Sequence, residues 1–179
     1  MRRVLALALV LLALPCLGAD PIQLPLDSAG KVTYQEAVSV DGVAVPELYA
    51  RAKAWVKAKA TPQAQLMTDM IDGQTSAEIS FRDAFTALPG NKATQVTVHY
   101  ILTLEVREAR FRYTLTWFTV AGPKDQKEIP LEASLDGAAP KPGSERLVED
   151  IHARVYAFTS DLKTAMARPA PPVGQPPAK

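Results

Sequence analysis

The sequence predicts an α+β domain of two layers, in which one curved antiparallel sheet of about five strands carries two helices on one face. Residues 95–120 alternate between apolar and polar side chains over two arms, which is typical of strands with one buried face. Residues 46–59 and 145–166 carry apolar side chains at helical spacing instead. The order is strand, helix, four strands, helix. A single sheet with both helices on one face buries every apolar stripe at once.

The first 19 residues have the features of a secretory signal peptide. Two arginines precede an apolar run from Val4 to Leu14, and small residues surround a cleavage expected after Gly18 or Ala19. The run is too short to span a bilayer as an ordinary helix. We therefore expect an exported protein, either periplasmic or extracellular. The alternative is a lipoprotein domain anchored to the membrane through Cys16, for which Ala13-Leu14-Pro15 is a poor lipidation motif.

The remaining chain of about 160 residues suits one domain. Without Arg2 and Arg3, the 20 basic residues fall to 18 against 19 acidic ones, and this near-neutral balance argues against nucleic acid as a partner. We expect an extended lead-in over 20–30, the domain over 31–168 and a disordered tail over 169–179. The tail is rich in proline and cannot form a helix, although a docking peptide is an alternative use for it.

The first predicted strand covers 31–40 and ends at Asp41-Gly42. The helix over 46–59 follows, with Pro46 in its first turn and Glu47 complementing the helix dipole. Its apolar stripe is expected in the core, whereas three basic residues are placed on the opposite side. The stripe is Leu48, Ala52, Trp55 and Val56, and the basic residues are Arg51, Lys53 and Lys57.

Two hairpins follow. The first joins 65–71 to 74–85 around Asp72-Gly73, which sets Leu66 beside Ile79. The second is the central hairpin of the fold and turns near Glu108 and Ala109. Its buried face is predicted to pair Val106 with Phe111, Leu104 with Tyr113, Leu102 with Leu115 and Tyr100 with Trp117. Its other face is predicted to pair Glu105 with Arg112, Thr103 with Thr114 and His99 with Phe118.

A long polar connection over 121–143 leads to the last helix. An edge segment near 129–135 is doubtful there because Pro130 cannot donate to a ladder. Ser144 is expected to cap the helix. The apolar stripe of the helix is the clearest in the chain: Leu147, Val148, Ile151, Val155, Phe158, Leu162 and Met166.

Four stretches carry a similarity to known proteins: Gly30–Tyr34, Pro46–Val56, Val98–Leu102 and Arg110–Thr116. They resemble bacterial domain-of-unknown-function family 4468. The similarity covers about 24–120 and departs from the expected pattern at the Glu108-Ala109 turn and in the long connection before the last helix. It implies a fold like that of the TATA-box-binding protein (TBP-like). It implies no catalytic residues, because none are assigned to the family.

The residues themselves predict no catalytic, cofactor-binding or metal-binding site. His99 and His152 lie on different predicted elements, without a second histidine or an acidic residue at metal-binding spacing. Asp69 and Asp72 flank a turn, where carboxylates are usually solvated. The chain also has no nucleophile elbow and no phosphate-binding glycine loop. We therefore predict that the protein is not an enzyme and needs no cofactor.

The most suggestive feature is the predicted sheet face that no helix covers. We expect a binding face there for a second copy of the chain, a peptide or other protein, or a glycan. Its predicted residues are Thr97, His99, Ile101, Thr103, Arg112, Thr114, Thr116 and Phe118. Two stray hydrophobic residues, or a face covered by the lead-in or the tail, explain the same pattern.

Two further hypotheses remain open. Arg107, Arg110 and Arg112 gather at the hairpin end, with Arg82 predicted nearby, and they fit either an anion or acidic-glycan site or an ordinary charged surface. A pocket protein or enzyme of the cystatin or NTF2-like kind shares the helix-on-sheet architecture. That hypothesis requires polar groups between helix and sheet, where the sequence places mainly apolar ones.

Overall fold

A computed structural model describes residues 22–60, 64–68, 76–87, 93–123 and 127–168. The expected signal peptide, the tail, the Asp72-Gly73 turn and Asp69 lie outside these residues. The elements, in order, are β1 (Tyr34–Ser39), α1 (Val45–Lys59), β2 (Ala64–Thr68), β3 (Ser76–Ala87), β4 (Thr94–Arg107), β5 (Arg110–Ala121), β6 (Ile129–Pro130), the 3-10 helix η2 (Leu131–Ser134), β7 (Leu135–Asp136), β8 (Ala139–Pro140) and α2 (Glu145–Ala167).

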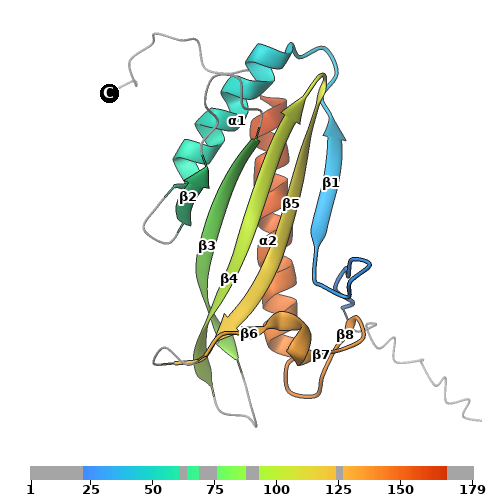
Figure 1. Cartoon of the computed structure of the whole chain (residues 1–179), viewed down its shortest axis with the longest axis vertical. Helices are drawn as coiled ribbons and strands as arrows, with labels where there is room; N and C mark the ends of the chain where they lie inside the picture. The colour runs from blue at the N-terminus through green and yellow to red at the C-terminus, as the bar shows by residue number, and fades with distance from the viewer. Residues whose placement is uncertain (1–21, 61–63, 69–75, 88–92, 124–126, 169–179) are drawn as a thin grey trace, which may run out of the picture.

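The sheet has the strand order β1-β5-β4-β3-β2, and all these neighbours are antiparallel. The short strand β6 also pairs with β5, at Thr119 and Val120, whereas β1 pairs with the other end of β5. In Figure 1 the long strands pass in front of α2, which runs along the back of the sheet. The predicted α+β class is therefore confirmed, and the predicted order strand, helix, four strands, helix holds with the short strands β6, β7 and β8 and the helix η2 added before α2.

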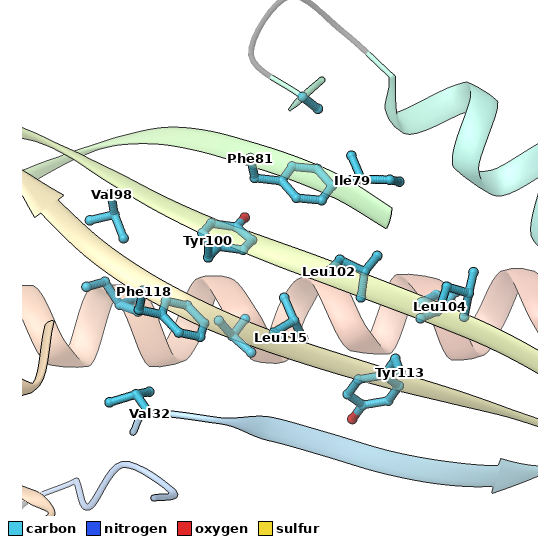
Figure 2. Packing of buried hydrophobic residues seen from close by; sticks show 14 of the residues in the cluster. Val32, Ile79, Phe81, Val98, Tyr100, Leu102, Leu104, Tyr113, Leu115 and Phe118 are labelled. Atoms are coloured by element: carbon cyan, nitrogen blue, oxygen red, sulfur yellow. The ribbon is translucent and has the colours of Figure 1, made fainter. Parts of the chain in front are cut away.

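The hydrophobic core lies between the helices and one face of the sheet (Figure 2). Leu102, Leu104 and Leu115 are fully buried there, as the alternation predicts. Each such side chain contributes roughly 1.5–3 kcal/mol when it leaves water. The lead-in contributes as well, because Leu24 is buried and its N–H donates to the carbonyl of Ala138 (2.9 Å).

The central hairpin has the predicted register from its turn to Ile101. Arg107 lies opposite Arg110, Val106 opposite Phe111 and Leu102 opposite Leu115. Beyond this point the prediction is wrong. The register shifts by one residue, so that Ile101 lies opposite Thr116 but His99 lies opposite Thr119.

The shift is a β-bulge, in which Tyr100 faces two residues of β5 instead of one. The bulge reverses the parity of β5, so Phe118 is 1% exposed and belongs to the core rather than to the open side of the sheet. Its ring stacks on that of Tyr100, with centroids 5.3 Å apart (Figure 2). The predicted pairs Tyr100–Trp117 and His99–Phe118 do not form.

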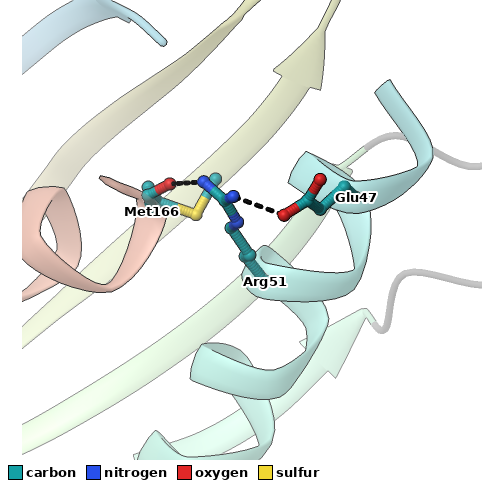
Figure 3. Close-up of polar contacts among 3 residues, drawn as sticks. All are labelled: Glu47, Arg51 and Met166. Carbon is teal, nitrogen blue, oxygen red and sulfur yellow. Dashed lines mark hydrogen bonds and ion pairs between the residues drawn. The ribbon is translucent and has the colours of Figure 1, made fainter. Parts of the chain in front are cut away.

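Helix α1 begins and ends as predicted, and Trp55 is buried in the core against Phe158. Arg51 differs from the prediction, because it is buried rather than exposed. Its guanidinium donates to the backbone oxygen of Met166 near the end of α2 (2.6 Å) and pairs with Glu47 one turn earlier (2.5 Å; Figure 3). A charged side chain thus joins the two helices at one end of the core.

Helix α2 follows the predicted stripe with two differences: Thr159 is buried, and Phe158 is only partly buried. Ser144 occupies the N-cap position, but its side chain does not cap the helix. The hydroxyl of Ser144 donates instead to the carbonyls of Lys141 (2.7 Å) and Ser134 (2.8 Å). This residue therefore fixes the connection before the helix. In the described part of the chain, no helix has both the length and the apolar character needed to span a membrane.

Candidate open-face binding site

The side of the sheet opposite the core carries a second set of side chains, which we call the open face. They follow from the strand register and the alternation of buried residues. The open face comprises Gln35, Ala37 and Ser39 of β1, Arg112, Thr114 and Thr116 of β5, Thr97, His99, Ile101, Thr103 and Glu105 of β4, and Glu78, Ser80, Arg82 and Ala84 of β3. The buried residues of both helices belong to the core cluster on the other side.

Seven of the eight predicted binding-face residues lie on the open face: Thr97, His99, Ile101, Thr103, Arg112, Thr114 and Thr116. Arg112 is exposed, and the other six are partly exposed. Phe118 is the exception, since the bulge turns it into the core. The predicted apolar patch therefore loses its aromatic member.

An exposed aromatic side chain precedes Phe118 in the sequence, at Trp117. It is 75% exposed and lies in the bulge with a backbone φ of 58°. This left-handed region suits glycine, and a bulky residue there is an outlier with a strain of about 1–3 kcal/mol. The fold needs an extra residue here but does not need tryptophan. A change of apolar parity along β5, from Leu115 to Phe118 and Val120, is the sequence signal that reveals this bulge.

Along one side, β5 pairs first with β1 and then with β6, and Trp117 lies in the stretch between these two paired segments. The pairing with β1 ends where Tyr34 meets Leu115, and that with β6 begins at Thr119. Trp117 therefore occupies the stretch of β5 between the paired segments, next to Thr116 on the open face.

A polar hollow lies at the β6 end of the open face. His99 Nδ1 lies 2.9 Å from a carboxylate oxygen of Glu128, and the hydroxyl of Thr119 donates to the other oxygen (2.8 Å). Arg82 and Thr97 line the same hollow. This histidine thus has an acidic partner that the sequence did not reveal, because Glu128 is 29 positions away across the long connection. Arg82 lies here rather than with the other three arginines.

A second hollow lies at the hairpin end of the open face. Arg107, Arg110 and Arg112 line it together with Ala37 and Glu105, in a volume of about 180 Å³. The structure thus brings together the three arginines that the sequence grouped. In the described part of the chain no three His, Cys, Asp or Glu side chains are grouped so as to hold a metal ion.

Polar contacts on the core side of the sheet bear on the pocket-protein hypothesis, and Tyr100 makes one of them. The hydroxyl of Tyr100 donates to a carboxylate oxygen of Asp83 (2.7 Å), and Arg154 of α2 lies 4.0 Å from the same oxygen. Burial, reinforced by Asp83, raises the pKa of Tyr100 well above its usual value. The tyrosine therefore stays protonated and acts as a hydrogen-bond donor.

The fold and the open face define a class: a two-layer α+β protein with one sheet face outside the helical layer. Residues 34–121 match the model of the family described as "Domain of unknown function (DUF4468) with TBP-like fold". The resemblance to this family seen in the sequence is therefore confirmed over this region of the chain.

Solved structures show the same fold. A DUF4468 family protein from Bacteroides ovatus matches with a TM-score of 0.65 at 11% identity, over 86% of this chain and 94% of that one. A TBP-like protein from Parabacteroides distasonis matches with a TM-score of 0.65 at 15% identity, over 82% of this chain and 98% of the other. No curated protein matches the sequence.

Proposed function

We propose that this protein is an exported, non-enzymatic binding module of the cell envelope that holds an extended acidic glycan on its open face. The observation that carries the proposal is Trp117, a 75% exposed aromatic residue held at a φ of 58° in a bulge that glycine would suit better. Strain of this kind is typical of functional sites.

The open face provides the other contacts that such a ligand needs. Four threonines, at positions 97, 103, 114 and 116, offer hydroxyl groups along two neighbouring strands. An exposed indole ring can stack on the flat side of a sugar while its N–H bonds a hydroxyl. The three arginines lie five or more residues from Trp117 along β5 and β4, so about 17 Å of extended ligand would connect the two ends.

The export part of the proposal is supported by the predicted signal peptide over 1–19. The non-enzymatic part is supported by the side chains of the open face, among which threonine is the most frequent residue. A peptide adding to a sheet would use the edge of a strand rather than this face.

Tryptophan fluorescence offers a direct test, because the chain has only two tryptophans. Trp55 is 5% exposed and Trp117 is 75% exposed, so the fluorescence of a Trp55→Phe variant reports on Trp117 alone. Its quenching by acrylamide would be measured with an oligogalacturonate, a neutral cello-oligosaccharide of equal length, an oligoglutamate peptide and increasing protein concentration.

We expect the oligogalacturonate to protect Trp117 from acrylamide more than the neutral sugar does. Protection by oligoglutamate alone would identify the ligand as an acidic peptide rather than a glycan and so contradict the proposal. Protection that grows with protein concentration alone would instead reveal an interface between two copies. Unchanged quenching under every condition would show that none of these ligands binds near Trp117 and would contradict the proposed binding function.

A further inference from the structure

We propose that Arg107, Arg110 and Arg112 form an oxyanion subsite that receives a carboxylate of the ligand. The inference rests on the proposed function, because it assigns the acidic group of the same ligand to one end of the open face. The hollow at that end is bounded by these three guanidinium groups, by Glu105 and by the small side chain of Ala37.

The register explains why three cations meet there. Arg110 lies directly opposite Arg107 in the last pair of the hairpin, and it lies opposite Ser39 on its other side. Arg112 belongs to the next pair on the same face, between Ala37 and Glu105. Like charges directly opposite one another destabilise an antiparallel pair. The hairpin thus holds a repulsive pair that an anion in the hollow would relieve.

The arginines have weak internal partners. Arg107 lies 3.9 Å from the carboxylate of Glu105, which is longer than a hydrogen bond, and both side chains are substantially exposed. Arg112 donates to Gln35, a neutral side chain, at 3.2 Å. Such contacts leave guanidinium N–H groups available for an oxyanion, which arginine binds in a bidentate manner.

Acidic residues do approach from the other side of the pair. Asp41 and Glu108 line an adjoining hollow together with Arg107 and Arg110. No ion pair within 4.0 Å joins either acid to an arginine in the described part of the chain, and neither lines the hollow that contains Arg112. The balance inside that hollow is therefore three positive charges against one negative charge.

Ala37 gives the subsite its space. Its neighbours on the same face of β1 are Gln35 and Ser39, and Ala37 is the residue of β1 directly opposite Arg112, where its side chain is only a methyl group. The hollow of about 180 Å³ is large enough for several waters or for a carboxylate group with its hydration. A larger side chain at position 37 would fill it without removing any arginine.

The experiment measures thermal stability at constant ionic strength with chloride, citrate, phosphate or the oligogalacturonate. We expect a saturable rise in Tm with citrate and oligogalacturonate, and an affinity at least tenfold lower in the Arg110→Gln and Ala37→Leu variants. Arg82→Gln, which removes an arginine from the same face near His99 but outside the hollow, is the matched control and should bind citrate as the wild type does.

Two results would overturn the subsite: no saturable effect beyond that of chloride, or an equal loss of affinity in Arg82→Gln. A saturable rise in Tm with phosphate but not with citrate or the oligogalacturonate would show that the hollow binds phosphate groups. That result would contradict the proposed carboxylate subsite. Ala37→Glu adds an independent readout, because its own carboxylate should raise the Tm at low salt and abolish the citrate response.

The two proposals fail in different ways. Arginine-dependent citrate binding with no protection of Trp117 by any probe would support the anion subsite but contradict the proposed binding function of the open face. Protection of Trp117 by the oligogalacturonate that is the same in wild type and Arg110→Gln would support the proposed binding function but contradict the arginine subsite.

Discussion

The ring of Phe118 stacks on the ring of Tyr100 at a centroid distance of 5.3 Å, although Trp117, the preceding residue, is 75% exposed. One extra residue in β5 creates this contrast. It places one aromatic side chain in the core and leaves its neighbour in water.

Truncation of these two neighbours should have opposite consequences. Phe118→Ala should lower the free energy of unfolding by about 3–5 kcal/mol, because it opens a cavity beside Tyr100 and Tyr34. Trp117→Ala should change it by less than about 1 kcal/mol, because little of this side chain is buried. Urea unfolding of both variants tests the register, and a large loss in Trp117→Ala with a small loss in Phe118→Ala would contradict it.

The sequence predicted most of the fold because alternation and helical spacing directly report burial. The alternation predicted the register of β4 and β5 up to Ile101. It did not predict the bulge beyond that point, because an insertion of one residue leaves the composition of a strand unchanged. The apolar parity changes after Leu115, and that change was visible. The prediction extended a regular hairpin beyond Leu115 and therefore placed Phe118 on the open face instead of in the core.

The remaining differences concern polar residues whose partners are distant in the sequence. Arg51 lies next to the apolar stripe of α1 on a helical wheel, and its burial depends on the carbonyl of Met166, 115 positions away, as well as on Glu47. The pairing of His99 with Glu128 depends in the same way on the long connection. The three arginines of the hairpin end were predictable as a group, because the pairs Arg107–Arg110 and Glu105–Arg112 are successive pairs on the same face of one hairpin.

The role of Arg51 leads to a second prediction. Arg51→Leu should lower the free energy of unfolding by about 1.5–3 kcal/mol, since a charged hydrogen bond to a buried carbonyl is lost. Glu47→Gln should cost less than about 1 kcal/mol, because that carboxylate is 44% exposed. Chemical denaturation of the two variants provides the comparison. Equal losses would show that the ion pair, and not the link to α2, stabilises the helices.

The third prediction concerns pH. Lys163 and Tyr113 both bond the carboxylate of Glu36 and hold its pKa below the usual value of 4.5. A carboxylate with a lowered pKa in the folded state stabilises the protein above its unfolded pKa, and this contribution disappears as the pH falls below about 4.5. The same pairing raises the pKa of Lys163 above 10.5, so a second contribution disappears only at more alkaline pH.

Thermal unfolding of wild type and Glu36→Gln across the pH range checks this prediction. The wild type should gain stability relative to the variant as the pH rises through the acidic region, and the difference should be small because both charged groups are partly exposed. A constant difference between the two proteins from pH 3 to pH 7 would contradict the assigned role of Glu36.

The fourth prediction concerns export. The intact mass of the protein recovered from a bacterial envelope fraction should correspond to a chain that begins after Gly18 or Ala19. A mass that includes residues 1–19 would contradict export with cleavage. A lipid-modified chain beginning at Cys16 would support the anchored alternative instead.

The most direct measurement combines the stability and the binding of Trp117→Gly. The account predicts a gain of about 1 kcal/mol, because glycine tolerates the positive φ, together with loss of oligogalacturonate binding. Ala109→Gly is the matched control, since Ala109 is the other described non-glycine residue with positive φ, and it should gain stability without losing the ligand. A Trp117→Gly protein that still binds the oligogalacturonate as tightly as the wild type would contradict the central claim.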